Sequence, residues 1–391
     1  MNEIVRGISI DNGGSECRVL EDGCSLASML TFPNDFMTIA ESDFREKDVE
    51  EPKNVCVFRE APKKDYLGII ANGLTGRAYN FTSLMLTSQE NKTSNTDYYH
   101  QFLFVVARDA LEVVLKTQEP VIVQKGLFRK REELEYEPLH INYAIGTCIP
   151  IKEHSGNKEC ANILRSAITG DYVVEFPLLS GKPVVRFTIH SKYVGVVPEG
   201  GVAIAGLSGK VDKEDFTLII DMGHVSTDIA VFKGAKAYGR VESSAYAGSM
   251  LVGDVRAALE EEGYRLSDEQ TRRVLETGVV KNGKNDVYVG AILDKCREEF
   301  VNNFLKKEIL QCLTRNTLNA KNIQNVLMLG APMKQTGHGS VRQAVIDKCG
   351  LESARVLELP IDPRYVNIKM TDIFTHKLTQ AATKEFTAVE E

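Results

Sequence analysis

The sequence contains one short pattern twice: an apolar strand, an aspartate and a turn that contains glycine. The first copy covers residues 8–15 and the second covers residues 218–224, so about half of the 391-residue chain separates them. A chain of this length is expected to form two domains or a two-lobed fold. We therefore expect two similar lobes, each of which contributes one loop to a shared site.

Strand and helix patterns alternate along the rest of the chain. Strand patterns occur at 139–149, 173–179, 184–189, 194–197 and 326–329, and helical spacing occurs at 97–116, 249–262, 268–277, 287–312, 340–349 and 365–384. This alternation predicts an α/β fold with mixed sheets. A generic two-domain α/β enzyme would show the same periodicity.

The composition argues against several classes of protein. No apolar run approaches the roughly 20 residues of a membrane helix, and no basic region followed by an apolar stretch marks a secretory signal. The net charge of −7 argues against direct binding to nucleic acid, because such binding depends on lysine and arginine. The eight cysteines include no Cys-x-x-Cys pair, which argues against a zinc cluster or a disulfide framework. We expect a soluble, cytoplasmic protein with reduced thiols.

The first copy of the pattern has the chemistry of a phosphate-binding loop. Gly13 and Gly14 allow backbone N–H groups to approach an anion closely, and Ser15 adds a hydroxyl donor. Asp11, which precedes Asn12, is able to hold a hydrated cation. An ordinary hairpin turn has the same sequence signature, so the segment is weak evidence by itself.

The second copy repeats this chemistry. Asp221 follows an apolar strand, and Gly223, His224 and Ser226 form the turn after it. A tight hairpin is again the simpler explanation of the segment alone. Together, however, two such units in separate lobes can place two carboxylates around one Mg²⁺-nucleotide.

Two later segments are candidates for nucleotide contacts. Gly248 and Ser249 open an amphipathic helix whose first N–H groups are expected to be free to bind an anion or a ribose hydroxyl, although Ser249 as a simple N-cap is an alternative. Gly330 and Ala331 follow a strand and form a small-residue turn against which a flat base can lie. A strand-to-helix loop explains this second segment equally well.

In this order, the four segments resemble the phosphate-1, phosphate-2, connecting-helix and adenosine segments of the actin-like ATPases. The chain is most similar to the plasmid-segregation actins of the ParM type. Residues 194–199 match a strand-Pro-Glu segment of that group, and Glu199 lies 22 residues before Asp221, as the family spacing has it. Residues 173–190 and 364–367 also fit, whereas the region of about 20–130 matches loosely.

The resemblance implies an actin-like fold of the duplicated ribonuclease H type, with two lobes around a nucleotide cleft. Lobe I would comprise residues 1–210 with 366–391, and lobe II residues 211–365. Asp11 and Asp221 would face Mg²⁺ through water, and Glu199 would orient or deprotonate the attacking water. A solvated carboxylate after a turn proline is the alternative for Glu199. The residues implied to contact ATP, or GTP, are Asn12, Gly13, Gly14, Ser15, Gly223, His224, Ser226, Gly248, Ser249, Gly330 and Ala331.

The chain departs from the family pattern at several places. Cys17 and Arg18 stand where the family usually has a small hydroxyl residue and often a lysine, and His224 replaces a small residue. Ala331 and Pro332 stand where glycines are common. These changes leave the turnover rate and the choice between ATP and GTP open.

The function that the resemblance implies is a bacterial ATPase that forms polar protofilaments and filaments and so segregates plasmid DNA. Its implied partner is a DNA-bound adaptor protein at a plasmid centromere, without direct contact to nucleic acid or membrane. A sugar- or acetate-type kinase of the same superfold is the main alternative, although no separate sugar-kinase signature is present. A chaperone-like relative and a membrane-bound cell-shape actin are further alternatives.

Overall fold

The fold is described from a computed structural model of the chain. It describes residues 3–13, 16–33, 36–40, 42, 44, 52–63, 67–72, 93, 96–125, 131–156, 158–176, 184–207, 209–282, 285–334 and 340–390.

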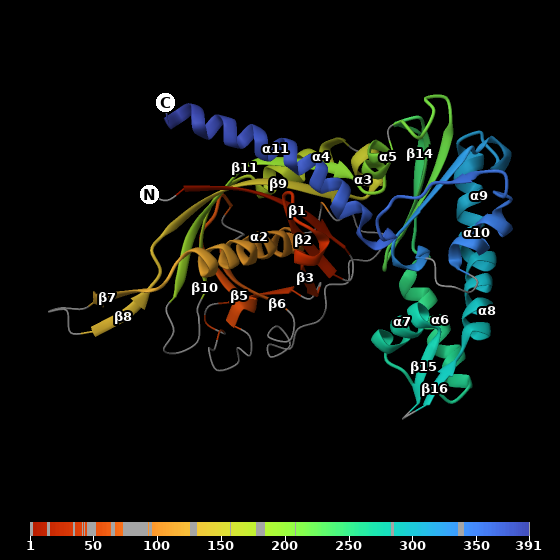
Figure 1. Cartoon of the computed structure of the whole chain (residues 1–391), viewed down its shortest axis with the longest axis horizontal. Coiled ribbons are helices and arrows are strands. Elements are labelled where there is room, and N and C mark those ends of the chain that lie inside the picture. Colours follow the sequence, from red (N-terminus) through yellow and green to blue (C-terminus); the bar gives the residue numbers. More distant parts are fainter. Residues whose placement is uncertain are drawn as a thin grey trace.

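The described residues form a first sheet of nine strands, in the order β3-β2-β1-β9-β11-β10-β5-β6-β4 (Figure 1). These strands are β1 (Glu3–Asn12), β2 (Glu16–Glu21), β3 (Leu30–Pro33), β4 (Phe36–Ile39), β5 (Val55–Glu60), β6 (Gly68–Asn72), β9 (Leu139–Ile149), β10 (Gly170–Phe176) and β11 (Val185–Pro198). Strand β9 pairs in parallel with both β1 and β11. The C-terminal ends of β1, β9 and β11 therefore meet at one edge of the sheet.

The second sheet repeats the core of the first. Its order is β14-β13-β12-β17-β18. Its strands are β12 (Phe216–Met222), β13 (Thr227–Lys233), β14 (Lys236–Ser244), β17 (Asn325–Leu329) and β18 (Arg355–Val356). In both sheets a meander of three consecutive antiparallel strands is extended by a later strand that pairs in parallel with the first of the three. The repeated hairpin pattern of the sequence therefore corresponds to a repeated topology.

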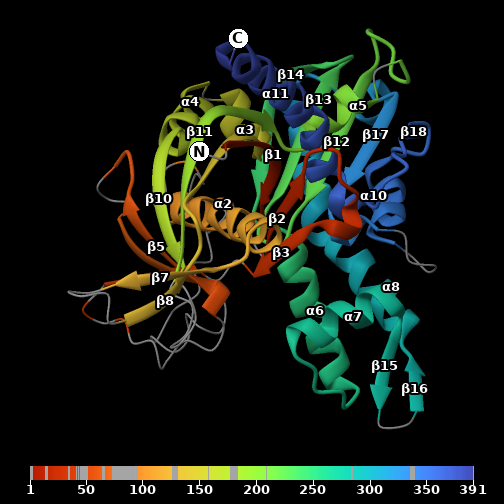
Figure 2. The same cartoon turned by 60° about the vertical axis from the view of Figure 1, so that its left-hand side comes forward.

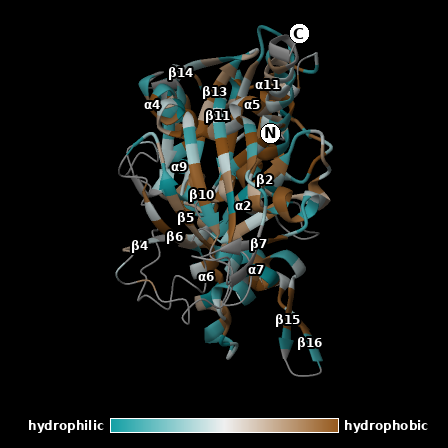
Figure 3. Ribbon diagram, turned by 90° about the vertical axis from the view of Figure 1, so that its left-hand side faces the viewer, coloured by the Kyte–Doolittle hydropathy of each residue, from teal (hydrophilic) through white to brown (hydrophobic). Residues whose placement is uncertain are grey.

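Helices cover both faces of the first sheet. One face packs against α2 (Thr96–Thr117) and α4 (Lys158–Ile168), which share a buried hydrophobic cluster with the inward side chains of β1, β9 and β11. Figure 3 shows the resulting alternation of hydrophobic and hydrophilic residues along β10 and β11. The opposite face packs against α11 (Val366–Glu390), which starts beside the second sheet and runs across the first (Figure 2).

The second sheet has a helical layer on one face and a shared core on the other. The helical layer is α6 (Gly248–Glu261), α8 (Gly290–Phe300), a π-helical turn η6 (Val301–Leu305), α9 (Lys306–Arg315) and α10 (Val341–Cys349). The other face packs against α5 (Gly201–Gly206), the start of α11 and Ile151 of α3 (Ile151–Gly156). This cluster links the second sheet to α11, which also packs on the first sheet.

The remaining elements lie at the margins of the molecule. They are the two-stranded ribbons β7 (Val121–Lys125) with β8 (Arg131–Glu135) and β15 (Val279–Asn282) with β16 (Asn285–Tyr288), and the helix α7 (Asp268–Thr277). Figure 1 shows the two ribbons at its lower left and lower right. Helix α7 has the bounds that the sequence predicts, because Ser267 and Gln270 form a capping box and Gly278 ends the helix in a left-handed conformation.

Two element predictions from the sequence are wrong in detail. The ranges 184–189 and 194–197 belong to one continuous strand, β11, which has an irregularity between Ser191 and Tyr193 where it pairs with β9. The helix expected from residue 287 begins at Gly290, because residues 285–288 pair with β15 as strand β16. Among the described residues, none of the helices has both the length and the apolar character that a membrane crossing requires.

Close packing of α11 depends on glycines in the strands beneath it. A Cβ atom at Gly146 would lie 2.0 Å from the hydroxyl oxygen of Thr375, and one at Gly195 would lie 2.2 Å from the ring of Phe374. These distances are far below van der Waals contact. The glycines therefore set how closely α11 approaches the sheet.

We predict that Gly146→Ala lowers the free energy of unfolding by roughly 1–3 kcal/mol, because the methyl group forces α11 away from β9. The measurement is urea denaturation followed by circular dichroism. Gly253→Ala in α6 is the matched control, because a Cβ atom at this position would have no neighbouring atom within 4 Å, and it should be neutral or stabilising. A Gly146→Ala variant as stable as the wild type would contradict this account of α11.

Candidate functional site

The two hairpins that the sequence singles out have the same backbone closure. The N–H group of Gly13 donates to the carbonyl of Glu16 at 3.1 Å, and the N–H group of Gly223 donates to the carbonyl of Ser226 at 2.9 Å. In each hairpin the aspartate lies one residue before the end of the first strand, at Asp11 and Asp221. The two turns are therefore equivalent loops on two different sheets.

Asp11 is buried and is held by a cation from the neighbouring strand. Its Oδ2 lies 3.2 Å from an Nη atom of Arg18, which also bonds Glu16 and donates to the carbonyl of Arg364 at 2.7 Å. Burial alone would lower the pKa of Arg18, but the charges of Asp11 and Glu16 outweigh it and raise this pKa. The guanidinium also lies over the ring of Tyr365, 5.2 Å from its centre.

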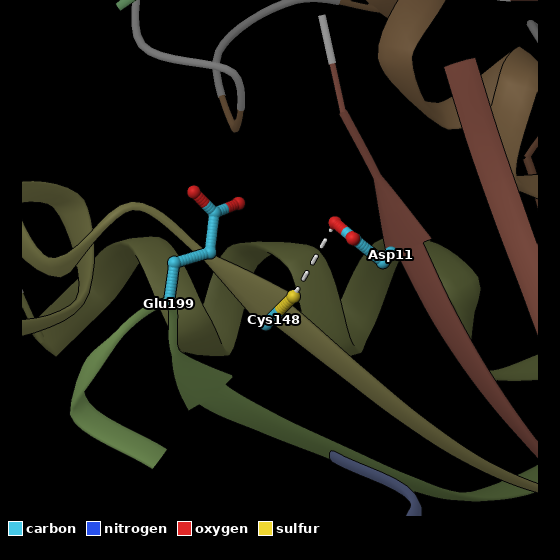
Figure 4. A group of neighbouring side chains, drawn as sticks. All are labelled: Asp11, Cys148 and Glu199. Atoms are coloured by element: carbon cyan, nitrogen blue, oxygen red, sulfur yellow. Dashed lines mark hydrogen bonds between the residues drawn. The ribbon is translucent and has the colours of Figure 1, made fainter. Parts of the chain in front are cut away.

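Glu199 lies beside Asp11 at the shared edge of β1, β9 and β11. The ligand atoms of Asp11, Cys148 and Glu199 lie within 4.8 Å of one another, and Figure 4 shows the two carboxylates on either side of the Cys148 sulfur. The thiol of Cys148 donates to Oδ1 of Asp11 at 3.8 Å. Glu199 is half-buried, and its backbone N–H donates to the carbonyl of Ile149 at 2.7 Å.

Asp221 reaches the first sheet through one side chain of α11. The amide of Asn367 donates to Oδ2 of Asp221 at 2.8 Å and accepts from the backbone N–H of Gly200, also at 2.8 Å. Gly200 has a φ of +64° and directly follows Glu199, so this position favours glycine. Asn367 therefore links the second aspartate to the segment that carries Glu199.

The start of α6 differs from the expectation. Helix α6 begins at Gly248 with Ala247 as N-cap, so Ser249 lies inside the helix and is not its cap. The N–H groups of Gly248 and Ser249 donate to the carbonyls of Gly223 and His224, at 3.0 and 2.8 Å. These two groups are consequently not free for an anion, because they anchor the helix to the second hairpin.

The small-residue turn after β17 lies against the end of the neighbouring strand. A Cβ atom at Gly330 would lie 2.0 Å from the carbonyl oxygen of Met222, and the residue has a φ of +94°. Ala331 opens a short 3₁₀ turn and is exposed. The sequence prediction of a tight turn at this place is confirmed.

His224 lies in the second hairpin turn next to α7. Its Nε2 atom lies 3.1 Å from an Nη atom of Arg272. Burial and the charge of Arg272 lower the pKa of His224 below its ordinary value of 6.5. These surroundings therefore favour the neutral imidazole.

Of the predicted site residues, Gly14 and Ser15 lie outside the described residues. Asn12 is buried at the end of β1, and its amide donates to Gln101 at 3.2 Å. Sequence reasoning did not identify Cys148 as part of this site. The only available signal was its place at the end of a predicted strand, because the ends of neighbouring parallel strands form the usual binding edge of a sheet.

The donor atoms at this edge fit a hydrated Mg²⁺ ion. Asp11 and Glu199 offer carboxylate oxygens, the donor type that Mg²⁺ binds directly or through its water ligands, and Asp221 offers another near the end of β12. The sulfur of Cys148 is a soft donor and does not suit Mg²⁺. The carboxylates, and not the thiol, are therefore the groups that would hold such an ion.

No protein-family model and no curated protein matches the sequence. By structure, the chain is similar to the actin-like protein Alp7A, with a TM-score of 0.65 and 16% identity over 100% of both chains. It is also similar to Ta0583, an archaeal actin homolog, with a TM-score of 0.59 and 12% identity over 96% of this chain and 99% of that one. A third similar structure is Bacillus thuringiensis ParM with AMPPNP, with a TM-score of 0.59 and 10% identity over 95% and 98% of the two chains.

These similarities extend over nearly the whole chain. The chain therefore has the actin-like fold, and the fold class that the sequence predicts is confirmed.

We predict that Arg272→Gln raises the pKa of His224 part of the way towards 6.5, because the positive charge is removed while the burial remains. Titration of the imidazole resonances by NMR measures this change. Arg273→Gln is the control, because Arg273 pairs with Glu269 and is exposed. Equal shifts of the His224 pKa in the two variants, or no shift in Arg272→Gln, would show that Arg272 does not lower this pKa.

The lowered pKa of His224 also makes the free energy of unfolding depend on pH. Because the folded chain holds the His224 proton less tightly than the unfolded chain, this residue contributes stability above pH 6.5 that is lost as the pH falls towards the lower, folded-state pKa. Arg272→Gln should make that loss smaller.

Proposed function

We propose that this protein is a nucleotide-dependent, filament-forming ATPase that segregates plasmid DNA. The observation that carries the proposal is the pair of equivalent hairpins, each with an aspartate, on two sheets joined beside Glu199. This arrangement suits a ligand with several phosphates, which both loops contact at once. The nucleotide is ATP or GTP, and it binds between the two lobes.

In this proposal the residues divide into three groups. Asp11 and Asp221 hold Mg²⁺ through water, and the ion neutralises phosphate charge when it is bound. Glu199 orients or deprotonates the attacking water, a role worth about 10²–10⁴-fold in rate. The two turns surround the phosphates, with Gly13, Gly14 and Ser15 on one sheet and Gly223, His224 and Ser226 on the other. Gly248, Ser249, Gly330 and Ala331 lie on the nucleoside side.

The proposal divides the chain into lobe I, residues 1–210 with 366–391, and lobe II, residues 211–365. The two sheets and the packing of α11 on the first sheet support this division. Nucleotide bound to both hairpins would favour a closed arrangement of the lobes. A closed form with a new head-to-tail contact leads to open filaments, since a heterologous interface repeats without closing.

A structural similarity supports assembly. The chain is similar to the subunit of a 15-stranded ParM filament from Clostridium botulinum, with a TM-score of 0.52 and 14% identity. For this chain we propose self-association into polar protofilaments in the bacterial cytoplasm, and a DNA-bound adaptor protein at a plasmid centromere as its partner. The net charge of −7 supports an adaptor over direct DNA contact.

We predict that Mg-ATP or Mg-GTP raises the light scattering of the purified protein, followed by phosphate release and decay of the signal. Mg-ADP should give no such rise. Scattering and phosphate are measured in the same sample over time. Phosphate release that needs an added sugar or carboxylate, without scattering, would favour a kinase instead.

We predict that Glu199→Gln slows phosphate release by about 10²–10⁴-fold while nucleotide binding is retained, because the amide cannot accept a proton from water. Stopped assays of phosphate release and a fluorescent-nucleotide titration measure the two effects. Glu175→Gln is the matched control, since Glu175 pairs with Arg59 on β5, away from this edge. Equal release rates for Glu199→Gln and the wild type would remove Glu199 from the mechanism.

A further inference from the structure

The group formed by Asp11, Cys148 and Glu199 contains a thiol, which the binding of phosphate and Mg²⁺ does not require. The three side chains come from three different chain segments, at the ends of β1 and β9 and directly after β11 (Figure 4). Two of them are buried, since Asp11 is 7% exposed and Cys148 is 0% exposed. A thiol between two carboxylates is a set of donors for a metal ion that accepts both sulfur and oxygen.

The distances within the group are close to those of a tetrahedral site. Zn²⁺ binds thiolate sulfur at about 2.3 Å and carboxylate oxygen at about 2.0–2.2 Å, which places neighbouring sulfur and oxygen ligands about 3.5 Å apart. The sulfur of Cys148 lies 3.8 Å from Oδ1 of Asp11, and all three ligand atoms lie within 4.8 Å. Small side-chain movements therefore complete the three-ligand geometry.

Tyr98 of α2 is a fourth polar group that bears on this proposal. The Tyr98 side chain is fully buried, and its hydroxyl has no hydrogen-bond partner among the described residues. Burial raises the pKa of Tyr98 well above its ordinary value, and interactions with Glu199 and Cys148 raise it further. An unpaired buried hydroxyl is unfavourable, and a water molecule on a bound ion would satisfy it.

The charge of Arg18 does not block such a site. Arg18 contacts Oδ2 of Asp11, whereas the thiol of Cys148 contacts Oδ1. One oxygen of Asp11 thus remains directed at Cys148 and Glu199. The cation that these three residues suit is soft, because sulfur is a poor ligand for Mg²⁺.

We propose that Asp11, Cys148 and Glu199 form an inhibitory site for a thiophilic divalent cation of the Zn²⁺ class. On binding, the Cys148 thiol loses its proton to solvent as the metal–sulfur bond forms, and Tyr98 donates to the water that is the fourth ligand. The inhibitory part rests on the proposed function, since the cation occupies the two carboxylates that the nucleotide site uses. The sequence expectation of plain reduced thiols is thereby extended, because Cys148 binds metal without a Cys-x-x-Cys motif.

The test uses Co²⁺ as a spectroscopic probe of the full-length protein, after metal is removed with a chelator. Co²⁺ should produce a sulfur-to-cobalt charge-transfer absorption and tetrahedral ligand-field bands, which added Zn²⁺ abolishes. Cys148→Ala should lose these bands, while Cys349→Ala, which also replaces a buried thiol, should retain them. No band in the wild type, or equal bands in both variants, would overturn the site. This readout does not depend on nucleotide hydrolysis.

Two further measurements keep the test decisive. Thermal unfolding reports whether Cys148→Ala folds. If that variant does not fold, Asp11→Asn is used in its place and should weaken Co²⁺ binding by more than about tenfold. Zn²⁺ should slow phosphate release by the wild type and by Cys349→Ala, but not by Cys148→Ala. Equal slowing in all three proteins would overturn the inhibitory role, whereas a lack of hydrolysis in the wild type would count only against the proposed function.

Discussion

The side chain of Asn367 joins Asp221 of the second sheet to the segment that directly follows β11 of the first sheet. Its amide donates to the carboxylate of Asp221 and accepts from the backbone N–H of Gly200, the residue after Glu199. Because an amide has one donating and one accepting end, it can connect a carboxylate and an N–H group at once. Each such bond contributes about 0.5–1.5 kcal/mol, but together they fix the relative position of both halves of the site.

The positive charge of Arg18 balances the buried negative charge of Asp11 without a bound ligand. A buried carboxylate is costly unless it is paired, and here Arg18 supplies the pair. Arg18 also donates to the carbonyl of Arg364, three residues before Asn367. Arg18 therefore connects the first hairpin to the segment that enters α11.

Local sequence patterns predicted much of this molecule. The repeated hairpins, the helix α7 and the strand β9 follow from turn glycines, caps and apolar runs, which act within a few residues. The proximity of Cys148 to Asp11 could not be predicted, because it depends on the parallel pairing of β1 with β9 across more than a hundred residues. The bridge through Asn367 and the anchored amides of Gly248 and Ser249 also depend on tertiary packing, which periodicity does not encode.

The central claim is that both hairpins contact one nucleotide. Hydrogen–deuterium exchange, with and without Mg²⁺ and a non-hydrolysable ATP analogue, tests it most directly at a protein concentration too low for assembly. Our account predicts slower exchange in peptides covering residues 11–16, 199–201 and 221–227, all over the same range of nucleotide concentration. Slower exchange in only one hairpin, or in neither, would contradict it.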